Sequence, residues 1–328
     1  MKRRDFIKTN LVLSTGAFSL HSASFFCAAG NNHTQTKIVS ARDVHLQTGN
    51  GQIDTDRLIA LLDKSVQAFF DRDNSDVAWK QIARPGEVIG LKVNCLSGKR
   101  GGTHRELVSA VCERLQAIGI KAQDIIIWDR LNEDLEDGGF QVSHRERKIQ
   151  CYGNDMVGFA SDFEIYGSAA SLITKTMTEI CDGVINMPVL KDHGIAGITM
   201  SLKNMFGAIH NPNKYHLNVG DPYIADVYML PSIRKKVRFT ICDAIQAQYE
   251  GGPSFMPQWC WPYNGLLVGT DPVALDYHGW QIIEQKRLEN KLKSLKQDNR
   301  EPRYINTAAD KNHQIGINDP DRISVIEV

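Results

Sequence analysis

Two apolar segments separated by a helix-length segment constrain the fold of this chain more than any other feature. Residues 87–94 (EVIGLKVN) and 124–130 (DIIIWDR) have the continuous apolar character of strands buried on both faces. Between them lies a glycine-rich loop and then a helical pattern that ends at Gly119. This order favours a parallel sheet. We predict an α/β fold with a mostly parallel sheet, helices on both faces, and an arrangement that allows two lobes around a cleft.

Other segments of the sequence predict further helices and strands. The sequence predicts a capping box formed by Thr103 and Glu106, and a helix that begins with Asp271 as N-cap and Pro272 in its first turn. The charged residues 284–303 are typical of a solvated helix face and linker. Further strands are predicted at 37–46, 148–152, 162–165, 184–187, 237–242, 265–269 and 323–328, and further helices at 54–70, 171–181 and 225–230.

The first thirty residues have the features of a targeting segment. Arg3 and Arg4 stand in an R-R-x-F-x-K arrangement before a mildly apolar run that ends in small residues, which resembles a twin-arginine export signal. The alternatives are an accidental Arg pair before a weak amphipathic helix, or an uncleaved anchor. We expect residues 1–30 to be cleaved after passage through the twin-arginine export machinery. Residues 31–328 would then form one periplasmic α/β domain with no stable membrane span.

Charge and cysteine spacing exclude several classes of protein. The chain has 328 residues, and its 38 Lys and Arg balance its 38 Asp and Glu, so we expect no nucleic-acid partner. None of the seven cysteines belongs to a C-x-x-C pair, so a zinc ribbon and a ferredoxin-type cluster lack their ligands. Cys112 and Cys242 lie among apolar residues and are predicted to be buried thiols.

The segment from residue 182 to residue 216 is unusually polar for one that begins as a buried strand. In open α/β sheets, ligands bind outside the carboxyl ends of the strands, which is where this segment would lie. We therefore expect it to form the floor of a functional site. Its polar side chains are Lys191, Asp192, His193, Lys203, Asn204, His210, Asn211 and His216.

These side chains suggest acid–base chemistry on an anion. Lys191, Lys203 and His193 suit an anionic substrate or proton transfer, and Asp243, which follows an apolar strand, would orient them or bind a metal. We assign these four residues as catalytic candidates. His193 and His216 are the first candidates for metal ligands, although each histidine taken singly is more often a hydrogen-bonded loop residue.

A second cationic feature is the loop from Ser97 to His104, which leads into a helix N-terminus. Free backbone N–H groups and two cations make it a candidate anion site, and an exposed turn with solvated basic residues is an equal alternative. The candidate residues for binding a small anion are Lys92, Asn94, Lys99, Arg100, Thr103, His104 and Asn204.

Several motifs, in order along the chain, resemble those of the domain-of-unknown-function 362 family over residues 86–280. They are G-x-x-V-x-x-K-x-N, the strand that ends at Asp129, D-G-V-I-N-M-P-V-L-K-D-H, T-M-S-L-K-N-M-F-G, I-C-D-A-I, E-G-G-P and T-D-P-V-A-L-D. The resemblance implies an α/β fold and a shared site, but no agreed reaction. Many relatives carry a ferredoxin-like iron–sulfur module, whose cysteine run this chain lacks. By looser analogy, the arrangement is similar to that of the nickel-dependent lactate racemase group.

These observations together favour an exported enzyme that acts on a small anionic or carboxylate substrate. The export signal and the histidines also suggest a metal ion or a metal-containing cofactor, whose identity the sequence does not give. The reaction, oxidoreduction or isomerisation, stays open. The alternative is a non-catalytic periplasmic protein that binds a ligand, delivers a cofactor or serves as partner in a redox complex.

Overall fold

A ten-stranded sheet forms the centre of the computed structural model, which describes residues 35–145 and 147–328. β11 is antiparallel to both of its neighbours, β8 is antiparallel to β9, and all other neighbours in this sheet are parallel. The predicted mostly parallel α/β fold is confirmed. The strands lie in the order β12 (Ile323–Glu327), β1 (Thr36–Arg42), β11 (Cys260–Gly269), β10 (Val237–Gln248), β7 (Gly183–Asn186), β2 (Ile89–Lys92), β3 (Ile125–Asp129) and β4 (Gln150–Gly153), and β8 (Val189–His193) pairs with β10 and with β9 (Gly197–Thr199).

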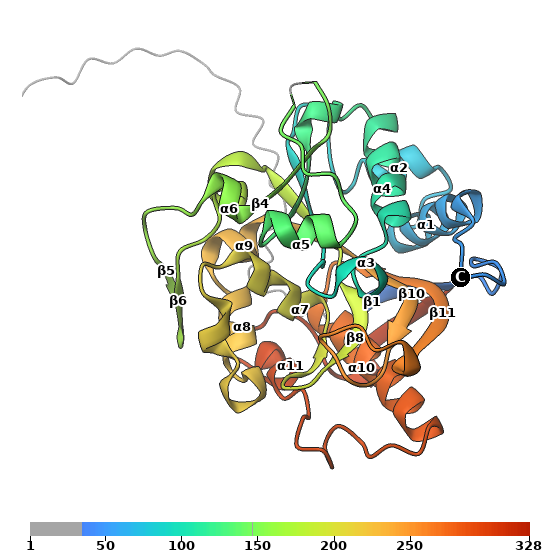
Figure 1. Cartoon of the computed structure of the whole chain (residues 1–328), viewed down its shortest axis with the longest axis vertical. Helices are drawn as coiled ribbons and strands as arrows, with labels where there is room; N and C mark the ends of the chain where they lie inside the picture. The colour runs from blue at the N-terminus through green and yellow to red at the C-terminus, as the bar shows by residue number, and fades with distance from the viewer. Residues whose placement is uncertain (1–34, 146) are drawn as a thin grey trace, which may run out of the picture. The chain divides into compact units, whose positions relative to one another are not determined.

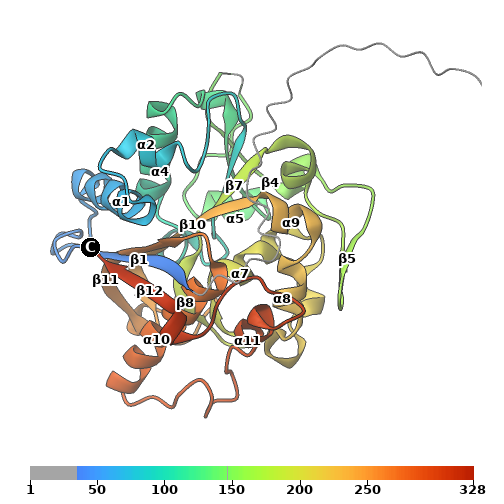
Figure 2. The same cartoon turned by 180° about the vertical axis from the view of Figure 1, so that it is seen from behind.

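Helices cover both faces of this sheet, as alternate side chains of its strands show. Ile125 packs into one apolar cluster and Ile126 into the other. The first cluster includes the apolar faces of α1 (Thr55–Phe70), α2 (Ser75–Trp79) and α4 (Arg105–Ala117), which lie together in Figure 1. The second includes α8 (Tyr223–Tyr228), α9 (Pro231–Lys236), α10 (Pro272–Glu289) and α11 (Tyr304–Ala309), which Figure 2 shows from behind.

Short elements fill the connections. The hairpin of β5 and β6 is separate from the main sheet. No helix among the described residues combines the length and the apolar composition needed to cross a bilayer. The short elements are α3 (Gly98–Gly101), α5 (Asn132–Asp137), α6 (Asn154–Val157), α7 (Ser201–Asn204), β5 (Glu164–Tyr166), β6 (Ala169–Ser171), the π-helix η2 (Thr176–Ile180), and the 3₁₀ turns η1 (Ala122–Asp124), η3 (Met205–Ala208), η4 (Pro212–Tyr215), η5 (Leu217–Gly220), η6 (Pro257–Trp259) and η7 (Pro320–Arg322).

Pro188 divides what would otherwise be one strand into β7 and β8. β10 pairs first with β7, up to Thr240 opposite Asn186, and then with β8, from Asp243 opposite Val189. Proline has no N–H to donate to a neighbouring strand, but its carbonyl accepts the N–H of Asp243 at 2.8 Å. The predicted strand end at Cys242 is therefore wrong, because β10 continues to Gln248 and carries Asp243 in its interior.

Three further expectations are corrected. Thr103 does not cap α4, because His104 is the N-cap residue and the Thr103 hydroxyl donates instead to the carbonyl of Met187 at 2.8 Å. The predicted helix at 171–181 is shorter and of another type, because β6 ends at Ser171, residues 172–174 are not helical and the π-helix η2 covers Thr176–Ile180. Arg287, in the segment predicted to be solvated, is fully buried and forms ion pairs with Glu250 and Asp298.

Other expectations are confirmed. The Asp271 side chain accepts the N–H groups of Val273 and Ala274 at the start of α10. Cys112 and Cys242 are buried, and the six cysteines of the described residues are all free thiols.

Candidate functional site

The carboxyl ends of β2, β3 and β7 bring polar side chains to one edge of the sheet. Lys92 ends β2 and pairs in register with Asn186, which ends β7, while Asp129 ends β3. These ends lie side by side because the strands are parallel, so residues far apart in sequence become neighbours. The candidate site is built on this edge.

Lys92 is a structural cation. Its buried Nζ donates to Asp129 Oδ1 at 2.8 Å, to the carbonyl of Val93 at 2.6 Å and to Asn204 Oδ1 at 3.3 Å. A lysine has three donors, so this ammonium is fully engaged as well as neutralised. Gly207 packs directly against it, and a Cβ at that position would lie 2.4 Å from Lys92 Cε. This close approach explains why a glycine follows Phe206.

A chain of amides connects Lys92 to a second lysine. Asn204 Nδ2 donates to Asn186 Oδ1 at 2.7 Å, and its Oδ1 accepts from Asn94 Nδ2 at 3.1 Å. Asn94 Oδ1 in turn accepts from Lys191 Nζ at 3.0 Å. Each amide is therefore oriented by partners on both its oxygen and its nitrogen, which fixes the geometry between the two lysines.

Lys191 is buried without a counter-ion. Its Nζ donates to Asn94 Oδ1, to Ser97 Oγ at 2.6 Å and to the carbonyl of Gly101 at 3.2 Å, all of them neutral acceptors. No carboxylate of the described residues forms an ion pair with it. Burial lowers the pKa of Lys191 to about 8. All three N–H donors of Lys191 are occupied, so the ammonium can attract a ligand in the site through its charge but not through a hydrogen bond.

Lys203, on α7, is the second buried lysine without a carboxylate partner in the described part of the chain. Its Nζ lies 3.1 Å from His216 Nε2 and 4.8 Å from the centre of the Phe206 ring. Burial, together with the charge of Lys191, lowers the pKa of Lys203 to about 7. At neutral pH the charged and the neutral form of this amine are therefore both populated.

His193 and His216 stand next to this amine. Their rings stack with centroids 5.7 Å apart. His193 Nδ1 accepts the N–H groups of Ile195 and Ala196 at 3.1 and 3.2 Å, so the ring proton of its neutral form is on Nε2. Burial and the charge of Lys203 lower the pKa of His193 to about 2, which keeps the ring neutral. Its Nε2–H has no partner among the described residues.

His216 is oriented by the backbone. Its Nδ1 lies 3.3 Å from the carbonyl of Asn213, which can only accept, so Nδ1 carries the proton and Nε2 presents a lone pair to Lys203. Burial and Lys203 also lower the pKa of His216. The pair therefore consists of an amine and a neutral imidazole that accepts from it.

Asp243 contacts His104 instead of the lysines. Its carboxylate accepts the N–H of His104 at 2.7 Å and contacts His104 Nδ1 at 2.8 Å. Burial opposes protonation of His104, but the charge and hydrogen bond of Asp243 outweigh it and raise the pKa of His104. The structure therefore places Asp243 and His104 together, and neither forms a hydrogen bond with Lys191 or Lys203. Their proposed catalytic and binding roles stay predictions.

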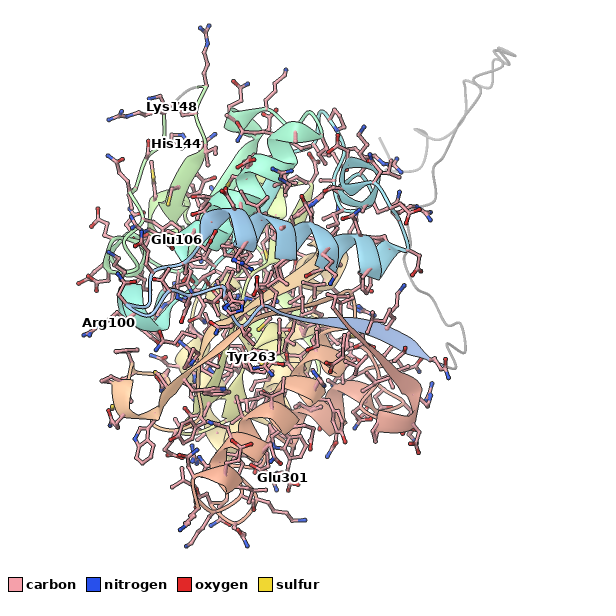
Figure 3. All side chains as sticks on the ribbon, turned by 90° about the vertical axis from the view of Figure 1, so that its right-hand side faces the viewer. Arg100, Glu106, His144, Lys148, Tyr263 and Glu301 are labelled. Carbon is pink, nitrogen blue, oxygen red and sulfur yellow. The ribbon has the colours of Figure 1, made fainter. Side chains whose placement is uncertain are left out.

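The remaining candidates lie at varying distances from the lysines. Thr103 joins the loop to the sheet, since its hydroxyl accepts the N–H of Asn94 at 2.9 Å. Lys99 and Arg100 are exposed on α3, and Arg100 lies over the ring of Phe255 at the outside of the molecule (Figure 3). His210 is also exposed. The structure thus assembles Lys92, Asn94, Lys191, His193, Lys203, Asn204 and His216, but not the basic side chains of the loop.

Sequence reasoning missed residues that position the site. The sequence indicates Ser97, which accepts a hydrogen bond from Lys191, only as part of the loop, and Asn186 only as part of a strand. Asp276 accepts the N–H groups of Ser201 and Leu202 at 2.6 and 3.1 Å and so caps α7, which carries Lys203. The sequence leaves open whether Asp276, in the helix that follows Asp271, reaches the site or only packs, and it does not indicate the partner of this carboxylate.

An ion-pair network holds the strand that carries Lys191 and His193. Asp192 is fully buried, accepts the N–H of Gly252 at 2.8 Å and pairs with Arg300 at 3.1 Å. Arg300 also pairs with Glu250 at 2.8 Å. Because neighbouring residues on a strand point to opposite faces, Asp192 fixes β8 from one side while Lys191 and His193 face the other.

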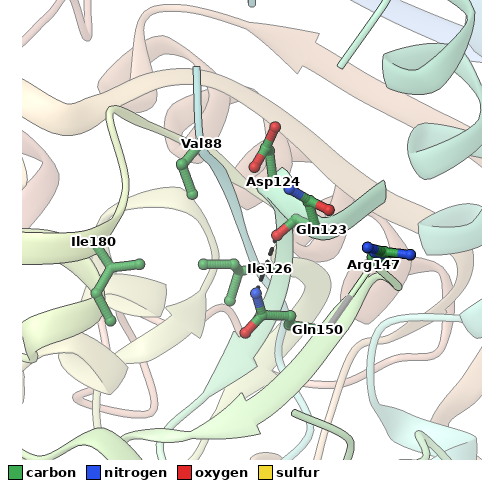
Figure 4. A pocket seen from close by; sticks show the side chains of 7 residues that line it. All are labelled: Val88, Gln123, Asp124, Ile126, Arg147, Gln150 and Ile180. Atoms are coloured by element: carbon green, nitrogen blue, oxygen red, sulfur yellow. Dashed lines mark hydrogen bonds between the residues drawn. The ribbon is translucent and has the colours of Figure 1, made fainter. Parts of the chain in front are cut away.

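One surface hollow lies away from these lysines and histidines. A cavity of about 460 Å³ is formed at the amino ends of β2 and β3, and Figure 4 shows the side chains that line it. Gln150 crosses it to donate to the carbonyl of Gln123 at 3.0 Å. It is open to solvent and holds none of the lysines or histidines described above. Its lining residues are Val88, Gln123, Asp124, Ile126, Arg147, Gln150 and Ile180.

No group of three or more His, Cys, Asp or Glu side chains suited to a metal ion occurs in residues 35–145 and 147–328. Of the two predicted ligands, His216 uses Nε2 for Lys203, while His193 keeps Nε2 unengaged. Two histidines alone do not complete a protein-held metal site. Metal binding by His193 and His216 stays a prediction.

The fold and site define a class: α/β proteins with a buried lysine–histidine cluster at the carboxyl edge of a mostly parallel sheet. The chain belongs to the family described as a domain of unknown function (DUF362), whose model matches residues 89–281. This range contains the whole cluster from Lys92 to His216, and also Asp276.

Comparison with individual proteins gives more distant matches. The chain is 28% identical over 215 residues to the thylakoid-associated protein sll1697 of Synechocystis sp., a match that covers 62% of this chain and 65% of that protein. A crystal structure of a Thermotoga maritima protein aligns with a TM-score of 0.42 and 10% identity, covering 73% of this chain and 60% of the other. The lactate racemase apoprotein of Thermoanaerobacterium thermosaccharolyticum aligns with a TM-score of 0.41 and 8% identity, covering 78% and 59%. The chain thus spans less than two thirds of the length of each.

Proposed function

We propose that this protein is an enzyme that binds a small carboxylate at Lys203 and transfers a proton to or from it. One observation carries the proposal: Lys191 and Lys203 are both buried, and neither has a carboxylate partner in the described part of the chain. Buried charges in proteins are normally paired, because an unpaired charge in a low-dielectric interior is costly. A bound anion supplies the missing charge.

The two lysines would have different roles. Among the described residues Lys203 has one hydrogen-bond partner, His216, so its remaining N–H groups are available to a ligand oxygen. Lys191 has no free donor and would favour the anion through its charge. His193, with its unengaged Nε2–H, would donate to the substrate, while His216 would exchange a proton with Lys203.

A metal-containing cofactor is a further part of the proposal. His193 Nε2 could bind the metal only after losing the proton it carries, as an alternative to donating to the substrate, and the missing ligands would have to come from the cofactor itself. Metal analysis of purified wild-type protein and of His193→Ala tests this point, with a stoichiometric metal lost in the variant as the expected result.

Export is also proposed. Residues 1–30, which resemble a twin-arginine signal, lie outside the described residues. We expect replacement of both Arg3 and Arg4 by lysine to keep the protein in the cytoplasm, as cell fractionation would show. Appearance of the double variant in the periplasm at wild-type levels would contradict this proposal.

A second candidate, non-catalytic delivery of a ligand to a partner, is favoured by three exposed apolar side chains near the site. Leu96, Ile195 and Leu217 are 60%, 48% and 69% exposed, and each follows a site residue by one or two positions. Such residues suit contact with another protein. A carrier would release its ligand unchanged, whereas an enzyme would convert it.

The test combines binding with turnover. Calorimetric titration with lactate, oxalate and phosphate should give binding that Lys203→Met weakens by at least tenfold, while Lys121→Met, an exposed lysine at the opposite edge of the sheet, serves as matched control. Proton transfer is followed by NMR in D2O, as exchange of the hydrogen next to the carboxylate of lactate and of the methyl hydrogens of pyruvate. If no anion binds to the wild type, the proposed function is wrong. Binding without exchange favours the carrier.

A further inference from the structure

We infer that Lys203 is a nucleophile that condenses with the carbonyl carbon of a small oxo acid and holds it as an imine. The inference rests on the proposed anion-binding function and names its substrate class. An oxo acid combines the two groups this site is suited to receive, namely a carboxylate and an electrophilic carbon next to it.

The geometry around Lys203 is that of an activated nucleophile. Such a group has a base within hydrogen-bond reach, and a third group orients the base. Here Nζ of Lys203 lies 3.1 Å from Nε2 of His216, and the carbonyl of Asn213 holds the Nδ1–H of His216 at 3.3 Å. The neutral imidazole therefore accepts the ammonium proton of Lys203 and leaves a free amine.

The surroundings of Lys203 favour that free amine. The side chain is 8% exposed, and its Nζ lies over the ring of Phe206. No carboxylate of the described residues pairs with its Nζ, and burial without a counter-charge disfavours the ammonium form. Lys92 shows the contrast, because its three donors are engaged and Asp129 neutralises it. Lys92 has no lone pair to offer.

The site also contains groups that can bind the oxygen atoms of the substrate. His193 presents an unengaged Nε2–H, and its ring stacks on that of His216. This donor can bind the carbonyl oxygen, while the proton that the leaving water needs comes from His216, which has accepted it from Lys203. The fixed charge of Lys191 favours a substrate that carries a carboxylate. A simple aldehyde would lack this second interaction.

The reaction is balanced without any co-reactant. The Lys203 nitrogen forms a bond with the carbonyl carbon, a proton passes from nitrogen to oxygen, and the carbinolamine loses water as its C–O bond breaks. Nothing is oxidised or reduced, and water reverses the step. The protonated imine withdraws electrons from the C–H bonds on the other side of its carbon, the methyl group in pyruvate, so the proton transfer that it promotes is at that carbon and not next to the carboxylate.

Reductive trapping tests the inference. The full chain is incubated at pH 7 with pyruvate and sodium cyanoborohydride, then examined by intact mass spectrometry and peptide mapping. We expect a single stoichiometric adduct, located on Lys203. It should be absent in Lys203→Met and Lys203→Arg, the latter keeping the positive charge, and unchanged in the control Lys121→Met. His216→Asn should slow trapping on the order of 100-fold, the scale of general base catalysis.

The outcomes separate the inference from the function on which it rests. If pyruvate binds to the wild type in calorimetry but leaves no adduct, the imine is excluded and anion binding stands. If neither pyruvate nor any other anion binds, both fail. An adduct that persists in the folded Lys203→Arg variant would also overturn the inference, since it would lie on another lysine. Circular dichroism of each variant establishes that it is folded.

Discussion

Lys203 Nζ and His216 Nε2 lie 3.1 Å apart and form a buried amine–imidazole pair, whereas Lys92 Nζ lies 2.8 Å from the carboxylate of Asp129. Lys92 donates to Asn204, the residue that follows Lys203 in the chain, yet the neighbours of the two lysines give them opposite properties. The carboxylate of Asp129 neutralises Lys92. Lys203 has no carboxylate neighbour among the described residues, so its amine can change its protonation state. This contrast leads to distinct expectations for variants.

Lys92→Met should be strongly destabilising. Removing the ammonium leaves Asp129 as a buried carboxylate without its cation, a change that costs about 3–5 kcal/mol. The two backbone N–H groups that Asp129 also accepts, from Cys95 and Arg130, offset only part of this. Urea denaturation measures the loss. A change in unfolding free energy of less than about 1 kcal/mol, the scale of an exposed pair, would mean that the pair is not buried in solution.

Lys203→Met should be stabilising near pH 7 and below. Burial lowers the pKa of Lys203 to about 7 from the ordinary 10.5, so between these values the unfolded chain binds a proton that the folded chain has lost. Stability therefore rises with pH across this window, by up to about 1.4 kcal/mol per pH unit for one proton. Below pH 7 both states are protonated, and the full penalty applies.

Urea denaturation from pH 6 to pH 10 checks this expectation. The wild type should become more stable as the pH rises, and Lys203→Met should lack this component. Lys121→Met serves as the control for general charge effects. Parallel curves for the wild type and Lys203→Met would show that Lys203 keeps an ordinary pKa.

His193 should stay neutral, with its proton on Nε2, throughout pH 5–9. Two backbone N–H groups are donated to its Nδ1, and burial with the charge of Lys203 lowers its pKa to about 2. Long-range ¹H–¹⁵N NMR distinguishes the two ring nitrogens and follows their shifts with pH. Titration of this ring near pH 6.5 would contradict the prediction.

Gly207→Ala should disturb the site without touching a polar group. The added Cβ would lie 2.4 Å from Lys92 Cε and 3.1 Å from Asp129 Oδ1, so the ion pair must shift. Overpacking of this kind costs about 1–3 kcal/mol. Gly49→Ala is a matched control, because its Cβ would meet nothing within 4 Å. Equal unfolding free energies for the two variants would refute the close approach of Gly207 to Lys92.

The sequence predicts the edge of the sheet better than the contacts made on it. β2, β3 and β7 are recognisable as apolar runs, and Lys92, Asp129 and Lys191 follow or interrupt them at positions that parallel strands bring together. Local patterns are enough for this, because burial on both faces leaves a mark on every residue of a strand.

The sequence does not predict which polar groups contact each other. The sequence predicts that Asp243 joins the lysines, but β10 continues beyond it to Gln248 and its carboxylate contacts His104. Thr103 matched a capping pattern, yet a contact 84 residues away in the sequence uses its hydroxyl. These contacts depend on how distant segments align with one another in the fold, and a single sequence does not show that alignment.

The cap of α7 has a consequence for how the protein is made. Ser201 and Leu202 donate their N–H groups to Asp276, which follows them by 75 and 74 residues. During synthesis on the ribosome, the segment that bears Lys203 is complete long before the carboxylate that holds it in place exists. The reactive amine therefore acquires its final surroundings late, after α10 has emerged and docked. A nascent or truncated chain that ends before Asp276 would carry every lysine and histidine of the site and still lack its chemistry.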